Sequence, residues 1–113
     1  MTEDYVSVQT AELLKEKGMD KSCFKHYVQK NNNDGTSEAV TVCTLQMAMK
    51  WLREVHNIFI DISPTHDMKE KTIHFIWQIF DSNYDVVGDC EIFYDKYEIA
   101  CEATIKYCLE NLI

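Results

Sequence analysis

An alternating run of oxygen-bearing side chains begins at Asp81 and has the residue types that bind calcium. Asp81, Asn83 and Asp85 occupy alternate positions, as do the first three ligands of a calcium-binding loop. Such a loop also needs a glycine at its sixth position and a bidentate glutamate at its twelfth. Val86 and Ile92 stand at those two positions. The run therefore predicts a turn, and we expect no calcium site there.

Histidine and cysteine are the other residue types that could bind a metal. The chain has four histidines and five cysteines, but neither a CxxC nor an HxxxH spacing. Cys101 and Cys108 are seven residues apart, which places both on one face of a helix. A free cysteine packs as a small hydrophobic residue. We therefore expect these thiols in the core, and neither a metal nor a cofactor.

Cys43 is the cysteine whose position best suits nucleophilic chemistry. It directly precedes a helix expected from Thr44, and the positive end of a helix dipole can lower the pKa of a thiol. A catalytic thiol also needs a neighbouring base, and packing against the first helical turn is the simpler role. The chain contains no GxGxxG, Walker or GxSxG motif. We therefore expect no enzymatic activity; an enzyme built from scattered Cys, His and acidic residues is the third alternative.

Acidic residues crowd the segment from 81 to 102, which holds seven acids and one lysine. A functional interpretation makes this segment a surface for a basic partner, or a mimic of nucleic-acid charge. The plainer interpretation is a solvated sheet edge and helix start, where acids discourage strand pairing and favour the helix dipole. The candidate binding residues of this acidic face are Asp81, Asp85, Asp89, Glu91, Asp95, Glu98 and Glu102.

Several large apolar residues fall outside the expected buried faces of their elements. Trp51 lies outside the helix face that Leu45 and Leu52 define. The other residues lie on those faces of the expected strands that point away from the predicted core. Either helices cover both sides of the sheet, or some of these residues form a patch that contacts a partner or a second copy of the chain. The candidate apolar interface consists of Tyr27, Trp51, Phe59, Ile76 and Phe80.

Length and composition indicate one folded domain spanning 1–113. A chain of 113 residues buries roughly two-thirds of its unfolded surface, and 46% hydrophobic residues are too many for a disordered chain. We see no apolar run near the roughly 20 residues that span a bilayer, and the first ten residues do not have the pattern of a secretion signal. We therefore expect a cytoplasmic protein, without membrane contact and with reduced thiols.

The net charge of −8 is concentrated in the second half of the chain. Residues 58–113 carry eleven acids and four bases, whereas residues 1–57 carry eight acids and seven bases. Nucleic-acid binding requires Lys and Arg to displace counterions from the phosphates. The charge therefore disfavours a nucleic-acid partner and favours a protein.

A helix from Thr44, followed closely by a strand, organises the predicted fold. Apolar residues recur there every three or four positions, at Leu45, Ala48, Met49, Leu52 and Val55. Thr44 suits the N-cap, and Asn57 suits a left-handed C-terminal position. The apolar period then changes to two from Ile58, and we expect Pro64 to end this strand at residue 62.

The remaining elements complete an α+β domain. We predict a helix over 7–17, a hairpin of strands 23–29 and 38–42, a central strand over 72–80 and a further strand to about 94. Asp95 and Glu98 have the spacing of a capping box for the last helix. The order is α-β-β-α-β-β-β-α, a small single domain with an antiparallel sheet and helices packed mainly on one face. Its core unit is 44–113, and 1–43 adds the first helix and hairpin.

Two stretches, TLQMAMKWLREVHNI at 44–58 and YEIACEATIKYCLENLI at 97–113, resemble a large set of short uncharacterised proteins of gut Bacteroides, their phages and their mobile elements. The resemblance extends to VSVQTAELLKEKG at 6–18. It implies a cytoplasmic accessory protein, and it implies no activity for any residue.

Two functions follow as hypotheses. The first is a non-catalytic protein-interaction module of a phage or mobile element, with a protein partner or a second copy forming a homodimer. The second is an inhibitor whose acidic face imitates nucleic acid toward a host DNA-binding protein. Salt separates them, because charge mimicry weakens steeply with ionic strength and an apolar interface does not.

Overall fold

The first helix lies within the predicted range 7–17 and is capped by Ser7. In the computed structural model, which describes residues 4–113, α1 spans Val8–Glu16. The Oγ of Ser7 accepts the Thr10 N–H at 3.2 Å, which satisfies one of the free donors of the first turn. Gly18 follows the helix with φ +100°, the left-handed conformation that commonly closes a helix.

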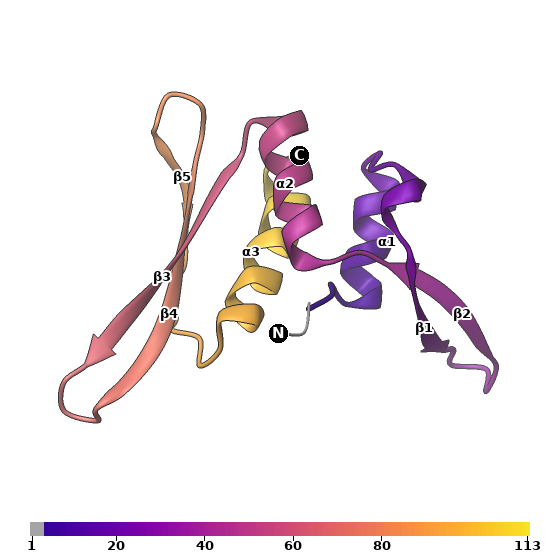
Figure 1. Cartoon of the computed structure of the whole chain (residues 1–113), viewed down its shortest axis with the longest axis horizontal. Coiled ribbons are helices and arrows are strands. Elements are labelled where there is room, and N and C mark those ends of the chain that lie inside the picture. The colour runs from indigo at the N-terminus through magenta and orange to yellow at the C-terminus, as the bar shows by residue number, and fades with distance from the viewer. Residues whose placement is uncertain (1–3) are drawn as a thin grey trace.

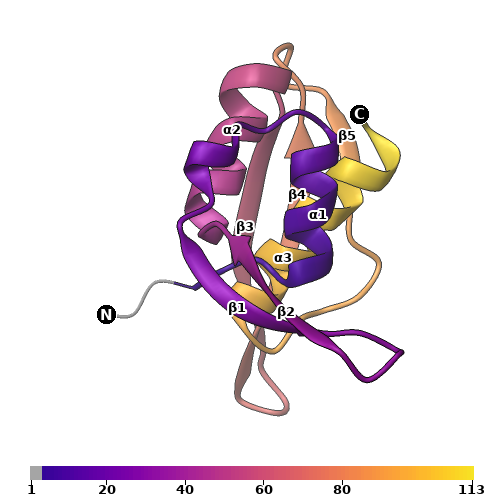
Figure 2. The ribbon, with the colours of Figure 1, turned by 90° about the vertical axis from the view of Figure 1, so that its right-hand side faces the viewer.

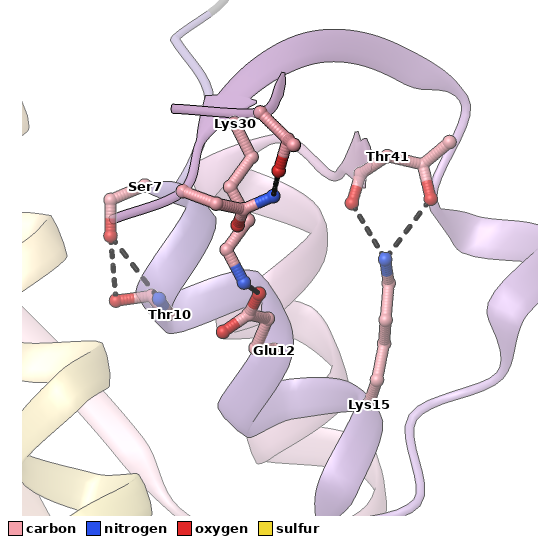
Figure 3. Close-up of polar contacts among 8 residues, drawn as sticks. Ser7, Thr10, Glu12, Lys15, Lys30 and Thr41 are labelled. Carbon is pink, nitrogen blue, oxygen red and sulfur yellow. Dashed lines mark hydrogen bonds and ion pairs between the residues drawn. The ribbon is translucent and has the colours of Figure 1, made fainter. Parts of the chain in front are cut away.

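A β-hairpin lies beside α1, and two lysines form polar contacts between them. The hairpin pairs β1 (His26–Asn31) with β2 (Ser37–Val42) in antiparallel register. Lys15 Nζ donates to the carbonyl and hydroxyl oxygens of Thr41 at 2.8 and 3.1 Å, and Lys30 forms an ion pair with Glu12, as Figure 3 shows. The expected strand at 23–29 begins later, because a short 3-10 helix, η1, occupies Lys21–Cys23.

The second helix confirms both predicted caps. α2 spans Leu45–His56; Thr44 Oγ1 accepts the Met47 N–H at 3.1 Å, and Asn57 has the left-handed φ of 56°. Its buried residues are Leu45, Ala48 and Leu52. The expected burial of Val55 is wrong, because this residue lies at the margin of the buried stripe and is 56% exposed.

Three antiparallel strands form the larger sheet, with β4 in the centre as predicted. The order is β3 (Phe59–Asp67), β4 (Thr72–Phe80) and β5 (Val86–Asp89). An isolated bridge between Phe75 and Tyr94 continues the β5 edge of β4 beyond β5 itself.

The prediction that Pro64 ends its strand is wrong, and the ladder geometry gives the reason. Pro64 lies opposite Phe75, whose N–H donates to Tyr94 O at 2.7 Å and whose carbonyl accepts the Tyr94 N–H at 2.9 Å. Phe75 therefore directs its backbone groups away from Pro64, and the proline nitrogen faces the open edge of the sheet. A missing donor costs no ladder bond there.

The last helix, α3, spans Tyr97–Asn111, and the expected capping box is wrong. Lys96 occupies the N-cap and, within the described chain, makes no side-chain cap bond. Asp95 lies one residue too early for that role, and its Oδ1 is 3.3 Å from His74 Nδ1 instead. The buried residues of α3 are Ala100, Cys101, Thr104, Ile105, Cys108 and Leu109.

The helices lie between the two sheets, as Figure 1 shows. Figure 2 places α1 and the β1–β2 hairpin on one side, with the larger sheet behind the helices. Both α2 and α3 contact β3, and α3 also contacts β4, so they cover one face of the larger sheet. The protein is thus a small α+β single domain with the predicted order of elements, and its strands form two sheets. Along the described chain we find no helix with the length and apolarity needed to cross a membrane.

Candidate functional site

The candidate site lies on the face of the larger sheet that points away from the helices. Directly opposed residues of antiparallel strands share a face, so the register defines this surface. Trp77 and Ile79 point inward and are 5% and 0% exposed, and the alternate residues therefore point outward. We call this surface the outer face; it consists of Phe59, Asp61, Ser63, Thr65, Asp67, Thr72, His74, Ile76, Gln78, Phe80, Val86 and Asp89.

Three of the five predicted interface residues come together on the outer face. Phe59 pairs directly with Phe80, and Val86 lies on the other side of Phe80, so one row across the three strands is apolar. Phe59 is 39% exposed and Val86 53%. Ile76 lies two rows further along β4 and is half-buried. Among residues 4–113 the helices lie on the opposite side of this sheet (Figure 1). Phe59 and Val86 are therefore exposed, and Phe80 is half-buried.

The other two predicted interface residues lie elsewhere. Tyr27 is on β1 of the smaller sheet and is 72% exposed. Trp51 is on α2, half-buried against the core, and its ring meets His56 edge-on with centroids 4.7 Å apart. The sequence interpretation that grouped all five into one interface therefore joins residues from three separate surfaces.

A small pocket opens at the Phe59 end of the outer face. It has a volume of about 280 Å³ and is lined by Phe59, Phe80, Asp81, Ser82 and Tyr84. Ligand sites for small molecules usually run from roughly 300 to 1,000 Å³. A pocket of this size suits a single side chain better than a cofactor.

Asp81, the first residue of the Asp81–Asp85 run that resembles a calcium-binding loop, stabilises the turn that contains Tyr84. The Asp81 N–H donates to Asp85 O at 3.0 Å, and the Tyr84 N–H donates to Asp81 O at 3.1 Å. Asp81 Oδ1 accepts the N–H groups of Asn83 and Asp85 at 2.8 and 3.1 Å. The carboxylate therefore acts as a turn acceptor, as the sequence predicted for this segment.

The predicted acidic residues lie in several different parts of the structure. Asp89 lies on the outer face, opposite Gln78, and Asp61 flanks Gln78 on the other side, so a second row across the sheet carries two acids. Asp81 and Asp85 belong to the neighbouring turn, and Glu91 follows β5.

The last three acids surround α3. Asp95 precedes the helix beside His74, Glu98 is exposed in the first turn, and Glu102 faces α1. Glu102 Oε1 accepts the Ser7 N–H at 3.1 Å and the Thr10 hydroxyl at 2.7 Å. Glu102 therefore joins two helices, and its role there is structural.

We compared the chain with protein-family models, curated proteins and solved structures. None matches it.

A second pocket lies on the opposite side of the molecule and includes two cysteines in its lining. It has a volume of about 450 Å³ and is lined by Tyr5, Ser22, Cys23, Lys25, His26, Val42, Cys43, Thr44 and Met47. Cys43 is only 2% exposed, and burial, followed by the nearby Cys23, raises its pKa to about 12. A thiol that stays protonated is a poor nucleophile, so the helix start does not activate Cys43. Within residues 4–113 we find no cluster of three His, Cys, Asp or Glu side chains that could hold a metal ion.

Thiol labelling tests this assignment. All five cysteines are free, and Cys23 and Cys90 are half-buried while Cys43, Cys101 and Cys108 are buried. With a maleimide at pH 7, we expect the two half-buried thiols to react first and Cys43 to react at least about tenfold more slowly, because the thiolate is the reactive form. Mass spectrometry of tryptic peptides measures each rate. Equal labelling of Cys43 and Cys23 in the native protein would contradict the burial, and labelling in urea provides the control for intrinsic reactivity.

The sequence analysis missed Tyr84, Val86 and Asp61 as members of the site. Asp61 alternates with Ile60 and Ile62 in the sequence, but the sequence does not identify its neighbour on the next strand. Tyr84 had a visible signal: a large aromatic residue within a turn that otherwise consists of Asp, Ser and Asn. A bulky side chain at a turn position therefore indicates a candidate binding site, as an exposed apolar residue does.

Proposed function

We propose that this protein is a non-catalytic interaction module that binds another protein through the outer face of its larger sheet. The observation that carries the proposal is the row of Phe59, Phe80 and Val86, which crosses all three strands on the side away from the helices. Exposed apolar side chains rimmed by polar ones are typical of protein-binding surfaces. An accessory role in a phage or mobile element is the setting that the sequence resemblance implies.

The charges of the outer face favour a different protein over a second copy. The strands that form this face have no Lys or Arg on it, whereas Asp61 and Asp89 are both exposed there. Two outer faces paired around a two-fold axis would bring acidic rows toward one another, and like charges oppose such pairing. A partner with apolar and basic residues would complement the surface, and a homodimer is the less favoured arrangement.

The alternative of a nucleic-acid mimic receives less support from the placement of the acids. A mimic needs many carboxylates on one continuous surface to imitate a phosphate backbone. Here Glu102 contacts α1, Asp95 lies beside His74, and Asp81 accepts bonds within its own turn. The outer face combines a few acids with an apolar row, which suits an interface in which charge steers a partner and apolar contact binds it.

Site-specific photo-crosslinking tests the proposed function. A benzophenone amino acid is placed at Val86, which is on the outer face, or at Tyr27, which is on the smaller sheet; both side chains are more than half exposed. In cells of the source organism, we expect a discrete crosslinked protein from position 86 and none from position 27. The complex should survive 500 mM salt, because its contact is mainly apolar.

The same experiment has two informative alternatives. Products from both positions, or from neither, would contradict the assignment of the outer face as the binding surface. Light scattering with size exclusion at 50 and 500 mM salt measures self-association in parallel. A dimer that Val86→Asp dissociates and Tyr27→Asp leaves intact would identify the partner as a second copy of the 13.3 kDa chain.

A further inference from the structure

We propose that the pocket lined by Phe59, Phe80, Asp81, Ser82 and Tyr84 binds a cationic side chain, a guanidinium or an ammonium group, of the protein partner. We call it the aromatic pocket. The inference rests on the proposed function and deepens it, since it names the chemical group by which the partner is anchored.

The composition of the aromatic pocket matches the requirements of an organic cation. Three of its five lining residues are aromatic, and a fourth is a carboxylate. The face of an aromatic ring attracts a cation through its quadrupole, and a carboxylate adds direct charge attraction. The long apolar stem of Lys or Arg can also lie along exposed ring surface. An apolar ligand would contact the rings alone and would make no use of the charge of Asp81.

The backbone conformation of Tyr84 is unusual for a tyrosine. Its φ is +66°, in the left-handed region that Gly or Asn usually occupies. A tyrosine there is strained, and its side chain is 88% exposed, so little burial within the chain offsets the strain. Strained residues of this kind concentrate at binding sites, where the strained position is part of the function. A role for the ring in holding a ligand accounts for a tyrosine at this position.

Asp81 is held in a fixed orientation at the same pocket. Its Oδ1 accepts the N–H groups of Asn83 and Asp85, so the carboxylate cannot rotate freely. A carboxylate has about four acceptor positions on its two oxygens, so Oδ2 can still accept from an incoming cation. The site is therefore organised before binding, which lowers the entropic cost of association.

The chain supplies no cation of its own to the segments that build the pocket. Neither 54–68 nor 72–95 contains a Lys or Arg. The cation–π pair recorded among the described residues joins Lys15 to Phe24 at 4.9 Å, and it lies on the other side of the molecule. The rings of Phe59, Phe80 and Tyr84 therefore remain available to an external cation.

Amide NMR titration with three small probes tests the inference without the partner. The probes are the N-acetyl amides of arginine, lysine and norleucine, the last being a neutral analogue of the lysine stem. We expect saturable shifts at Phe59, Phe80 and Tyr84 with the two cations, and binding of norleucine at least about fivefold weaker, since one cation–π contact is worth about that ratio. Raising salt to 500 mM should weaken only the cationic probes. A stronger response to arginine or to lysine then identifies which cation the pocket prefers.

Two substitutions separate binding from folding. Tyr84→Gly removes the ring and places a favoured residue at φ +66°, so we expect the melting temperature to be unchanged or higher while probe binding is lost. Asp81→Asn keeps an acceptor oxygen for the turn and removes the charge, and should weaken the cations without affecting norleucine. Tyr27→Gly, at an exposed tyrosine of the smaller sheet, is the matched control and should leave probe binding unchanged.

The outcomes that overturn the inference are distinct from failure of the proposed function. Equal binding of norleucine and arginine would show an apolar site, and absence of shifts at the three aromatic residues, or full binding by Tyr84→Gly, would exclude the pocket. Crosslinking from Val86 without probe binding would support the interaction module and reject the cation-binding pocket. Probe binding without a crosslinked partner would support a cation-binding pocket and reject a protein as its ligand.

Discussion

Ile79→Ala is expected to lower the free energy of unfolding by about 2–5 kcal/mol, the range for deleting a large aliphatic side chain from a packed core. Ile79 is 0% exposed near the C-terminal end of the central strand β4, between Ile60 of β3 and Gly88 of β5. Its Cδ1 would lie only 3.0 Å from a Cβ built on Gly88, which shows how closely β5 approaches it. The alanine would therefore leave a cavity that these neighbours cannot readily fill. Urea unfolding at 25 °C measures the loss.

Ile73→Ala is the matched control for this prediction. Ile73 has the same residue type, strand and sheet face as Ile79, but it lies toward the end of the β3–β4 hairpin and is 52% exposed. Both substitutions carry the same change in strand propensity, so their difference reports burial alone. We expect a loss of about 0.5 kcal/mol for Ile73→Ala, as for ordinary surface changes. Similar losses for the two variants would contradict the placement of the helices on the inner face.

Raising the pH from 8 to 10 is expected to lower the free energy of unfolding through three buried thiols. Burial raises the pKa of Cys43 and Cys108 to about 12 and that of Cys101 to about 11, against 9 for the free side chain. Above pH 9 the unfolded chain loses these protons while the folded chain retains them, so alkali favours unfolding. The stabilisation is complete below pH 9 and declines until the folded pKa values are reached. Each thiol contributes on the order of 1 kcal/mol over this interval, and the three together contribute a few kcal/mol.

Urea unfolding at pH 8, 9 and 10 in the presence of a reductant measures this slope. Cys108→Ala removes one of the three thiols and should make the decline shallower by about a third, whatever its effect on stability at pH 8. Cys90→Ala is the control, because Cys90 is half-buried and lies outside this group. A free energy of unfolding that stays constant from pH 8 to 10 would show that the three thiols ionise in the folded protein.

Much of the secondary structure was predictable because its signals are local. Thr44 and Asn57 mark the two ends of α2, since an N-cap oxygen and a left-handed residue act within one turn of the backbone. The bounds of β4 were predicted at Thr72–Phe80, because a run of β-branched and aromatic residues has few alternatives. Pro64 shows the limit of such signals. Whether a proline breaks a strand depends on which edge its nitrogen faces, and that is decided by the pairing of Phe75 with Tyr94.

The candidate site was only partly predictable for the same reason. Period-two alternation placed Phe59, Ile76 and Phe80 on the second faces of their strands, but alternation says nothing of which strands are neighbours. Only the register brings Phe59 opposite Phe80, and only the turn conformation brings Tyr84 to the same pocket. Tyr27 and Trp51 were grouped with them because they are large apolar residues outside the expected buried faces, and neither property shows which residues are close in space. Glu102 was grouped with the other acids because of its charge, although its partners, Ser7 and Thr10, are more than ninety residues away.

The order of helices and strands, the acidic charge and the α+β class could be predicted from the amino-acid sequence, because capping and periodicity act over a few residues and charge follows from composition. Three features depend on the tertiary structure: the strands divide into two sheets, the helices cover one face of the larger sheet, and the apolar row and the aromatic pocket lie on its other face. These features depend on contacts between residues far apart in the chain, whose free energies arise from burial and strand pairing and are not encoded in any local pattern.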